Sequence, residues 1–160
     1  MKAMIGRVLV CVLCVALFSF PARSPVQAEP MTCPAHTPVV IDIRPFSPIN
    51  WINLSSRGVL PVAVLTTQDF DASQFTPEMA HLTDATTAPS MGCTGATAVG
   101  WIRLDVNRDR RPDLVFFFKI QDLDLTSSST AASLMAHGLY GSATLHILGT
   151  DTVTILPKHP

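Results

Sequence analysis

The chain has little of what catalysis, membrane insertion or nucleic-acid binding usually requires. Its 160 residues contain neither a His-Glu-x-x-His motif nor a Gly-x-Ser-x-Gly motif, the signatures of zinc peptidases and of many serine hydrolases. The longest apolar run covers the 13 positions of residues 8–20 and is interrupted only by Ser19, whereas a membrane-spanning helix needs about 20 apolar residues. Basic residues number 11 against 12 acidic ones, so the surplus of positive charge that binds phosphate is missing. These absences argue against a familiar hydrolase, a membrane-anchored protein and a nucleic-acid-binding protein.

The beginning of the chain is typical of an exported protein. Lys2 and Arg7 provide a basic start, the apolar run of residues 8–20 follows, and Val26-Gln27-Ala28 forms a small-residue cleavage box. A secretory signal peptide has these three regions in this order. We therefore predict a cleaved signal peptide over residues 1–28 and export to the periplasm, the extracellular space or the cell surface. No membrane span is expected after cleavage.

The mature part has the size of one domain and a mildly acidic charge. Removing 28 of the 160 residues leaves 132, which is enough for a single domain with its own core. The removed segment carries three of the 11 basic residues and none of the 12 acidic ones, so the mature net charge is about −4, from 8 basic against 12 acidic residues. This charge again argues against a nucleic-acid partner.

Cysteine is scarce, and its placement predicts one disulfide. Of the four cysteines, Cys11 and Cys14 leave with the signal peptide, and Cys33 and Cys93 remain. In an oxidising compartment, a remaining pair of cysteines is most simply a disulfide. We therefore predict a bond between Cys33 and Cys93.

Strand signals dominate the mature chain. Short runs of β-branched and apolar residues are separated by Pro, Gly, Asp and Ser, a pattern typical of strands and tight turns. These runs predict strands at residues 39–44, 58–67, 97–106 and 113–120, and a C-terminal hairpin of residues 142–148 and 152–156 joined through 149–151. Pro61 predicts an edge position or a bulge within its strand, because proline cannot donate to a ladder.

Helical patterning is faint and limited to residues 76–82 and the surroundings of residues 131–136. We therefore predict an all-β fold, an antiparallel β-sandwich of the immunoglobulin-like kind with at most one or two short helical turns. Residues 29–38, rich in Pro and Thr, are expected to form an extended lead-in. Residues 39–157 are expected to form the single β-sandwich domain.

One loop carries the residue types of a metal site. Asp105, Asn107, Asp109 and Asp113 stand at positions 1, 3, 5 and 9 of the segment 105–113, and Arg111 at position 7 has a backbone carbonyl to offer. Alternate residues of a tightly turning loop can direct their oxygens at one centre, and calcium takes six to eight oxygen ligands. The spacing therefore predicts a structural calcium site between two strands.

Two features of the same loop favour a metal-free alternative. Position 6, where such loops place Gly for a sharp turn, is Arg110, and an Arg forced to positive φ costs on the order of 1 kcal/mol. The three arginines of the loop, Arg108, Arg110 and Arg111, also oppose a cation electrostatically. Position 12 is Phe116, where an EF-hand needs a bidentate Glu, so the loop is not a helical EF-hand. The alternative is a hairpin loop held by Asp–Arg pairs without a metal ion.

Several runs of the chain resemble an uncharacterised bacterial secreted β domain. They are Ile41-Asp42-Ile43-Arg44-Pro45, residues 50–54, Gly58 to Thr67 (GVLPVAVLTT), Asp69-Phe70-Asp71-Ala72, residues 105–115 (DVNRDRRPDLV) and Gly149-Thr150-Asp151-Thr152-Val153. In that family the corresponding runs read IDIKPGS, GVLPVAILTT, DFDA and DVNGDGRPDLV, so the resemblance covers most of the mature chain. It implies an exported β-sandwich-like module, often attached at the end of larger surface or secreted proteins, with no established activity. Both loop glycines of the family are arginines here, Arg108 and Arg110.

The residues favour a non-catalytic exported β module with a structural calcium loop and contacts to a protein or polysaccharide at the cell surface. The histidines do not argue for catalysis, since they show no ligand spacing along the sequence; they are His36, His81, His137, His146 and His159. His146, in an alternating strand pattern, is predicted at the surface. Asp69 and Asp71 are predicted in a turn around a buried Phe70 rather than as an acid–base pair.

Two alternative functions stay open. The first is a carbohydrate-binding module that uses Trp51 and Trp101 as an aromatic platform, although the apolar run around Trp101 predicts a core position for that side chain. The second is a secreted hydrolase of an unrecognised type. An exposed aromatic pair beside a groove would favour the first, and a cleft with converging histidines and carboxylates would favour the second.

Overall fold

The computed structural model describes residues 36–86 and 95–157. The predicted signal peptide lies outside these ranges, as do Cys33 and Cys93. Within them the chain forms ten strands and two short 3-10 turns: β1 (Thr37–Pro38), β2 (Ile41–Ile43), β3 (Trp51–Ile52), β4 (Val59–Val64), η1 (Ala72–Gln74), β5 (Phe75–Asp84), β6 (Ala96–Leu104), β7 (Asp113–Lys119), η2 (Ile120–Asp122), β8 (Ala131–Tyr140), β9 (Ala143–Thr152) and β10 (Thr154–Ile155). The predicted all-β class is confirmed. Neither helical turn in the described ranges is long and apolar enough to cross a membrane.

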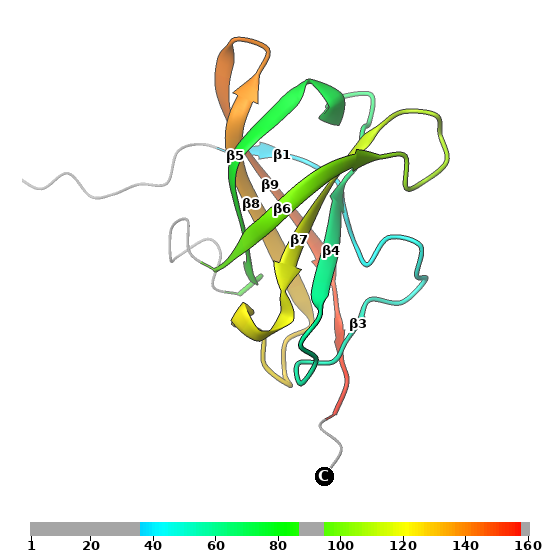
Figure 1. Ribbon diagram of the computed structural model, residues 1–160, viewed down its shortest axis with the longest axis vertical. Helices are drawn as coiled ribbons and strands as arrows, with labels where there is room; N and C mark the ends of the chain where they lie inside the picture. Colours follow the sequence, from blue (N-terminus) through cyan, green and yellow to red (C-terminus); the bar gives the residue numbers. More distant parts are fainter. Residues whose placement is uncertain (1–35, 87–94, 158–160) are drawn as a thin grey trace, which may run out of the picture. The chain divides into compact units, whose positions relative to one another are not determined.

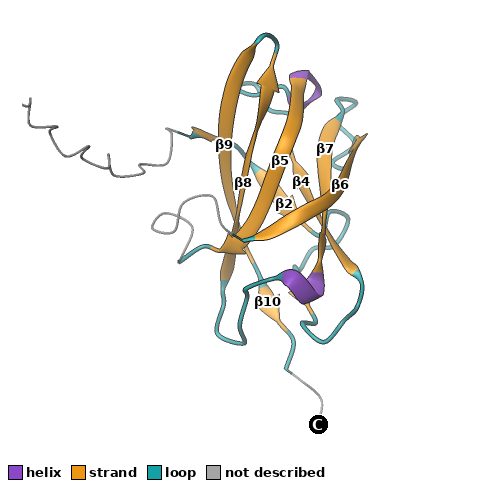
Figure 2. Cartoon of the chain, turned by 60° about the vertical axis from the view of Figure 1, so that its left-hand side comes forward, coloured by secondary structure: helices purple, strands orange, loops and turns teal. Residues whose placement is uncertain are grey.

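Eight strands form one curled sheet in the order β1-β9-β8-β5-β6-β7-β4-β2, and β10 and β3 form a separate pair (Figure 1). We divide the sheet into two halves, β1-β9-β8-β5 and β6-β7-β4-β2. The sheet curls because two segments pair with strands of both halves. Residues 37–43 pair with β9 through β1 and with β4 through β2. Strand β6 pairs with β5 at its start and with β7 along the rest of its length (Figure 2). The pairs β1–β9 and β10–β3 are parallel, so the sheet is mixed, and the immunoglobulin-like sandwich stays a prediction.

The curl places the main hydrophobic core between the two halves of the sheet, and a second, small cluster consists of Ala63, Val106 and Val115. Because side chains alternate between the faces of a strand, each half contributes every second residue of its long strands. The largest fully buried side chains come from both halves and include Phe75, Leu82, Leu134 and Ile147 from one half, and Leu60, Val62, Leu114, Phe116 and Phe118 from the other. Phe70 is also buried, at 4% exposed, as predicted for the turn around it.

The two segments with faint helical patterning are strands, which corrects the expectation of helical turns there. Residues 76–82 belong to β5 and residues 131–136 to β8, and these two strands pair with each other along almost their whole length. Alanine, leucine and methionine are among the best helix formers, but intrinsic propensity is small in energy and pairing inside a sheet readily overrides it. The helical turns that do form, η1 and η2, lie elsewhere.

The predicted C-terminal hairpin is also wrong. Strand β9 runs without a break through Gly149, and the tight turn lies earlier, between β8 and β9, where Gly141 has φ +63°. Gly149 is a point of close packing, since a Cβ there would lie 2.4 Å from Ile41 Cγ2 and 2.9 Å from the Val39 carbonyl oxygen. A glycine inside a strand often marks such an approach of another backbone.

Pro61 lies in an interior strand at a point where one neighbour has ended. Its carbonyl accepts a hydrogen bond of 2.9 Å from the Arg44 N–H, just beyond the last β2–β4 pair, Ile43 with Val62. In an antiparallel strand the N and O of one residue face the same neighbour. The N–H that proline lacks would therefore point past the end of β2, so Pro61 has the predicted edge environment on that side.

Candidate functional site

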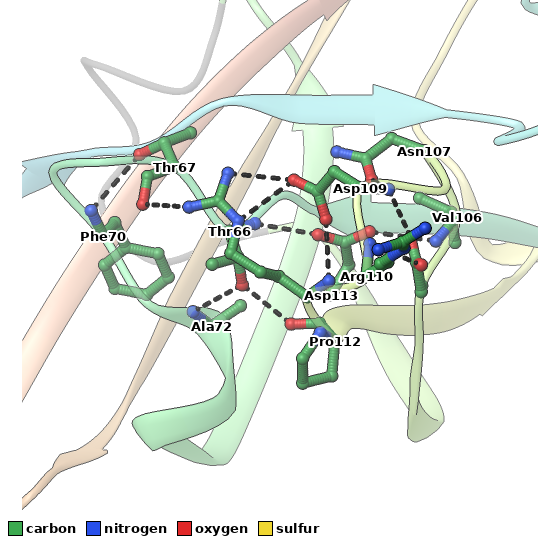
Figure 3. Close-up of polar contacts among 12 residues, drawn as sticks. Thr66, Thr67, Phe70, Ala72, Val106, Asn107, Asp109, Arg110, Pro112 and Asp113 are labelled. Atoms are coloured by element: carbon green, nitrogen blue, oxygen red, sulfur yellow. Dashed lines mark hydrogen bonds and ion pairs between the residues drawn. The ribbon is translucent and has the colours of Figure 1, made fainter.

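Asp113 is the best-defined of the predicted site residues. It begins β7 and is fully buried. Its Oδ1 accepts a hydrogen bond of 2.8 Å from the Thr66 N–H, and its Oδ2 accepts one of 3.0 Å from the Val106 N–H (Figure 3). The Thr66 hydroxyl extends this network, because it donates to the Pro112 carbonyl at 2.7 Å and accepts from the Ala72 N–H at 3.0 Å. The carboxylate therefore joins the segment after β4 to the loop between β6 and β7.

Asp105, Asn107 and Asp109 come together over the backbone of their own loop. Asp105 accepts from the Asp109 N–H at 3.2 Å and from the Arg110 N–H at 2.9 Å. The Asn107 side-chain oxygen also accepts from the Asp109 N–H, at 3.0 Å. Short-range bonds from Asp and Asn side chains to nearby N–H groups are typical of tight turns. These side chains therefore define the shape of the loop.

Arg111 brings a guanidinium group to the loop. Its Nε and Nη2 donate to Asp109 Oδ2 at 3.1 and 2.9 Å, and its Nη1 donates to the Thr67 carbonyl at 3.0 Å. The Arg111 N–H donates to Asp109 Oδ1 at 2.8 Å, and this backbone hydrogen bond is the main reason that the pKa of Asp109 lies below its ordinary value. The pair is solvent-exposed, so its role is to orient the loop more than to stabilise the fold.

Both arginines at the glycine positions have the backbone conformation that glycine favours. Arg108 has φ 63° and Arg110 has φ 70°, which confirms the positive φ expected at Arg110. An L-residue in this left-handed region costs roughly 1–2 kcal/mol. The loop therefore makes the sharp turn for which glycine is usual, although both positions are occupied by arginine.

Several oxygens of the predicted calcium ligands accept hydrogen bonds within the protein. Asp113 uses both carboxylate oxygens inside the protein, and Asp109 faces the Arg111 guanidinium. Among the described residues, no group of three or more His, Cys, Asp or Glu side chains could hold a metal ion, whereas calcium takes six to eight oxygens. The contacts match the alternative of a hairpin loop held by an Asp–Arg pair. Calcium binding at this loop stays a prediction, and so does the Cys33–Cys93 bond, which lies outside the described residues.

A groove lies between β5 and β6, and the sequence does not predict it. It has a volume of about 170 Å³. Its walls are Pro77, Glu78, Met79 and Ala80 from β5 and Thr97, Ala98, Gly100 and Trp101 from β6, with Phe116 of β7. Trp101 is 38% exposed, so its predicted core position is wrong. The reason is that β6 leaves β5 after its first residues and loses the cover of that strand.

Trp51, the second tryptophan, lies beside a different hollow. This hollow has a volume of about 230 Å³ and is bordered by Arg44, Asn53 and Ser56 among others. Trp51 is 49% exposed. The two tryptophans therefore line separate depressions, and the platform suggested for a carbohydrate-binding module would have to use one of them at a time.

Histidines that lie far apart in the sequence meet on the outer face of the sheet. His36, His81, His137 and His146 line a small hollow of about 10 Å³ together with Met135 and Ala136. His137 lies opposite His146 in the β8–β9 pair. The parallel pairing of Thr37 with Ile147 places His36 beside His146. All four rings belong to half-buried residues, so the predicted surface position of His146 is only partly right. Only the strand register reveals this cluster, and the register is not readable from residue spacing.

Comparisons with protein-family models, with curated proteins and with solved structures find no match to this chain.

Proposed function

We propose that the chain is an exported, non-catalytic β module that binds an extended segment of a partner protein in the groove between β5 and β6. The observation that carries this proposal is a pair of strand edges that separate while apolar side chains line the space between them. The signal-peptide pattern of residues 1–28 supports export. The loop carboxylates support a structural role, since Asp113 and Asp105 accept bonds from backbone N–H groups.

Strands β5 and β6 stay together over two residue pairs and then separate. Strands β5 and β6 pair only at His81 with Thr97 and at Leu82 with Ala96. Beyond that point, within the described residues, β6 pairs only with β7 and β5 pairs only with β8. Free N–H and C=O groups on a strand edge can form a ladder with an added strand, which is a common way to bind a peptide. Only an extended chain presents its backbone groups in the matching spacing.

Arg103 of β6 connects the start of β5 with Trp101, one of the residues that line the groove. Its Nη2 donates to the Phe75 carbonyl at 3.0 Å, and its guanidinium carbon lies 5.0 Å from the centroid of the Trp101 ring. A side chain thus satisfies a carbonyl at the start of β5 that a neighbouring strand would otherwise bond. An incoming segment would replace this contact while Arg103 swings aside, keeping its cation–π contact with Trp101.

The apolar character of β6 supports a protein partner. We call its four exposed apolar side chains, Val99, Trp101, Ile102 and Leu104, the β6 band; their exposed fractions are 53%, 38%, 45% and 44%. Of these four, Trp101 lines the groove. Side chains of successive residues point to opposite faces of a strand, so Trp101 and Ile102 present exposed apolar surface on the two faces of β6. An extended partner with alternating apolar side chains would cover the band with its side chains and fill the free edges with its backbone.

The test uses the fact that the chain has only two tryptophans. In the variant Trp51→Phe, Trp101 is the single fluorescent reporter of the groove. Peptides selected on the mature protein from a display library of extended segments, each about 5–10 residues long, are expected to change the Trp101 emission. They are also expected to slow amide hydrogen exchange along residues 98–104, because a new ladder protects N–H groups.

The matched variants are Trp101→Ala and Trp51→Ala, which remove the same side chain from the groove and from the other hollow. We expect the first to lose peptide binding and the second to keep it. Equal loss in both variants, or protection of amides outside β5 and β6, would rule out this groove as the binding site.

A carbohydrate ligand at Trp51 is the second candidate function. An exposed aromatic face next to Arg44, Asn53 and Ser56 suits a sugar ring, which needs stacking and hydrogen bonds together. Binding of a polysaccharide that Trp51→Ala abolishes and Trp101→Ala preserves would favour this candidate over the protein-binding groove.

A further inference from the structure

We propose that His137 and His146, with His36 as a third ligand, bind a divalent transition-metal ion of the kind that prefers imidazole, such as zinc or copper. The site would lie on the outer face of the sheet, away from the 105–113 loop. None of the three proposed ligands lines the protein-binding groove, although Glu78 beside His137 is one of its wall residues. Nothing in the sequence spacing of the histidines indicates the site.

The strand register presents the three imidazoles to the same side. His137 and His146 are directly opposite each other on β8 and β9, where cross-strand side chains come within about 5 Å of each other at Cβ. His36 continues the row, because β1 runs parallel to β9 with Thr37 beside Ile147. Ile147 is fully buried in the core, so its neighbour His146 points to the opposite, outer face.

The rings lie close together but are not yet arranged around one shared point, since the planes of the His36 and His146 rings are 84° apart. The ring centroids of His137 and His146 are 5.6 Å apart, and those of His36 and His146 are 6.1 Å apart. Two imidazoles bound tetrahedrally to one zinc ion at about 2.0–2.1 Å have centroids about 5 Å apart. As they stand, no three described side chains of the His, Cys, Asp or Glu type could hold an ion. Binding therefore includes a modest rotation of the rings, which half-buried side chains can make.

The charges around the cluster favour a cation. Glu78 Oε2 lies 3.8 Å from His137 Nε2 and adds negative charge beside the proposed ligands. The hollow between the rings measures about 10 Å³, close to the space of one water-sized sphere.

His81 provides a matched control within the same cluster. Its Nδ1 lies 3.4 Å from the Thr97 hydroxyl oxygen, on the side of β6. In the β5–β8 register it is opposite Met135. His81 thus borders the hollow without belonging to the row of His36, His137 and His146.

The experiment is a calorimetric titration of the mature protein with zinc chloride, using protein made without a histidine tag and freed of metal with a chelator. We expect one zinc ion per chain. His146→Asn and His137→Asn should each weaken binding by at least about tenfold, because each removes a ligand, whereas His81→Asn should weaken it by less than about threefold. His36→Asn should also weaken binding, and an unchanged affinity in that variant would overturn the assignment of the third ligand.

A second measurement does not depend on the variants folding. Zinc added to the parent protein should shift the imidazole NMR signals of His36, His137 and His146 and leave those of His81 in place. The proposal fails if the parent binds no zinc below millimolar concentration. It also fails if His81→Asn loses as much affinity as His146→Asn.

Discussion

The buried carboxylate of Asp113 offers the sharpest test of how the 105–113 loop is held. It accepts two hydrogen bonds, from the Thr66 N–H at 2.8 Å and the Val106 N–H at 3.0 Å. The side chain is fully buried, so water cannot replace the bonds when the carboxylate is removed. The informative changes are Asp113→Asn, which keeps the size of the side chain, and Asp113→Ala, which removes both acceptors.

The expected losses follow from the hydrogen bonds. A hydrogen bond to a charged group stabilises a fold by about 1.5–3 kcal/mol, and a buried donor left alone costs about 1–3 kcal/mol. Asp113→Asn keeps one acceptor and turns an NH₂ group towards the other N–H, so we expect a loss of about 2–3 kcal/mol. Asp113→Ala loses both bonds and leaves a small cavity, so we expect about 3–5 kcal/mol.

These losses are large enough to measure by calorimetric melting. The part of the chain that follows the predicted signal peptide has 132 of the 160 residues, for which the entropy of unfolding is roughly 0.3 kcal/mol per kelvin. A loss of about 3 kcal/mol therefore lowers the melting temperature by about 10 °C. The melts are recorded with calcium and with a chelator, because Asp113 is also a predicted calcium ligand.

We expect Asp113→Asn to lower the melting temperature by the same amount in both buffers, because its bonds are to backbone N–H groups. Asp109→Asn is the matched control, since that carboxylate is exposed and paired with Arg111 at the surface, and it should change the melting temperature little. A loss that occurs only in calcium would identify Asp113 as a metal ligand. An Asp113→Asn variant as stable as the parent would refute the structural role of the carboxylate.

Three further predictions concern the backbone and one titrating group. Gly149→Ala should destabilise the fold strongly, because its Cβ would lie 2.4 Å from Ile41 Cγ2, whereas Gly100→Ala in β6 should be nearly neutral, since no described atom lies within 4 Å of its Cβ; denaturant melts compare the two. Arg110→Gly should raise stability relative to Arg110→Ala by about 1 kcal/mol, because only glycine relieves the positive φ of 70°, and equal melting temperatures would contradict this. Burial, followed by the charges of two nearby aspartates, raises the pKa of Asp42, so its ionisation weakens the fold as pH rises through that pKa. Asp42→Asn should therefore raise the melting temperature at about pH 7 and lose this advantage below the ordinary value of 3.8, and a gain that persists in acid would point to another cause.

The sequence predicts those strands whose residues are β-branched or aromatic. Residues 58–67 and 113–120 contain β4 and β7, because valine and phenylalanine suit a pleated, buried surface. The loop between β6 and β7 and the positive φ of Arg110 also follow from local chemistry. In each case the information lies within a few neighbouring residues.

The features that the sequence does not predict depend on residues far apart in the chain. Strand β5 contains Pro77 and a bulge between Pro77 and Met79, so its pattern is irregular until β8 pairs with it. Gly149 is of a residue type that is common in turns, yet it lies within β9 because the chain near Ile41 packs against it. The histidine row requires the register of β1, β8 and β9, which only the folded sheet defines.

The groove between β5 and β6 is a consequence of how the sheet closes. At one closure, residues 37–43 change neighbours from β9 to β4 within a few residues, and Gly149 lets the backbones approach closely there. At the other, β6 follows β7 after only two pairs with β5, and Arg103 and Trp101 bridge the space in place of a ladder. A strand that turns from one half of a sheet to the other must leave the first half. The unpaired edges of β5 and β6 therefore result from the way in which the sheet curls. The exposed apolar side chains of the β6 band distinguish the groove from a simple break in strand pairing.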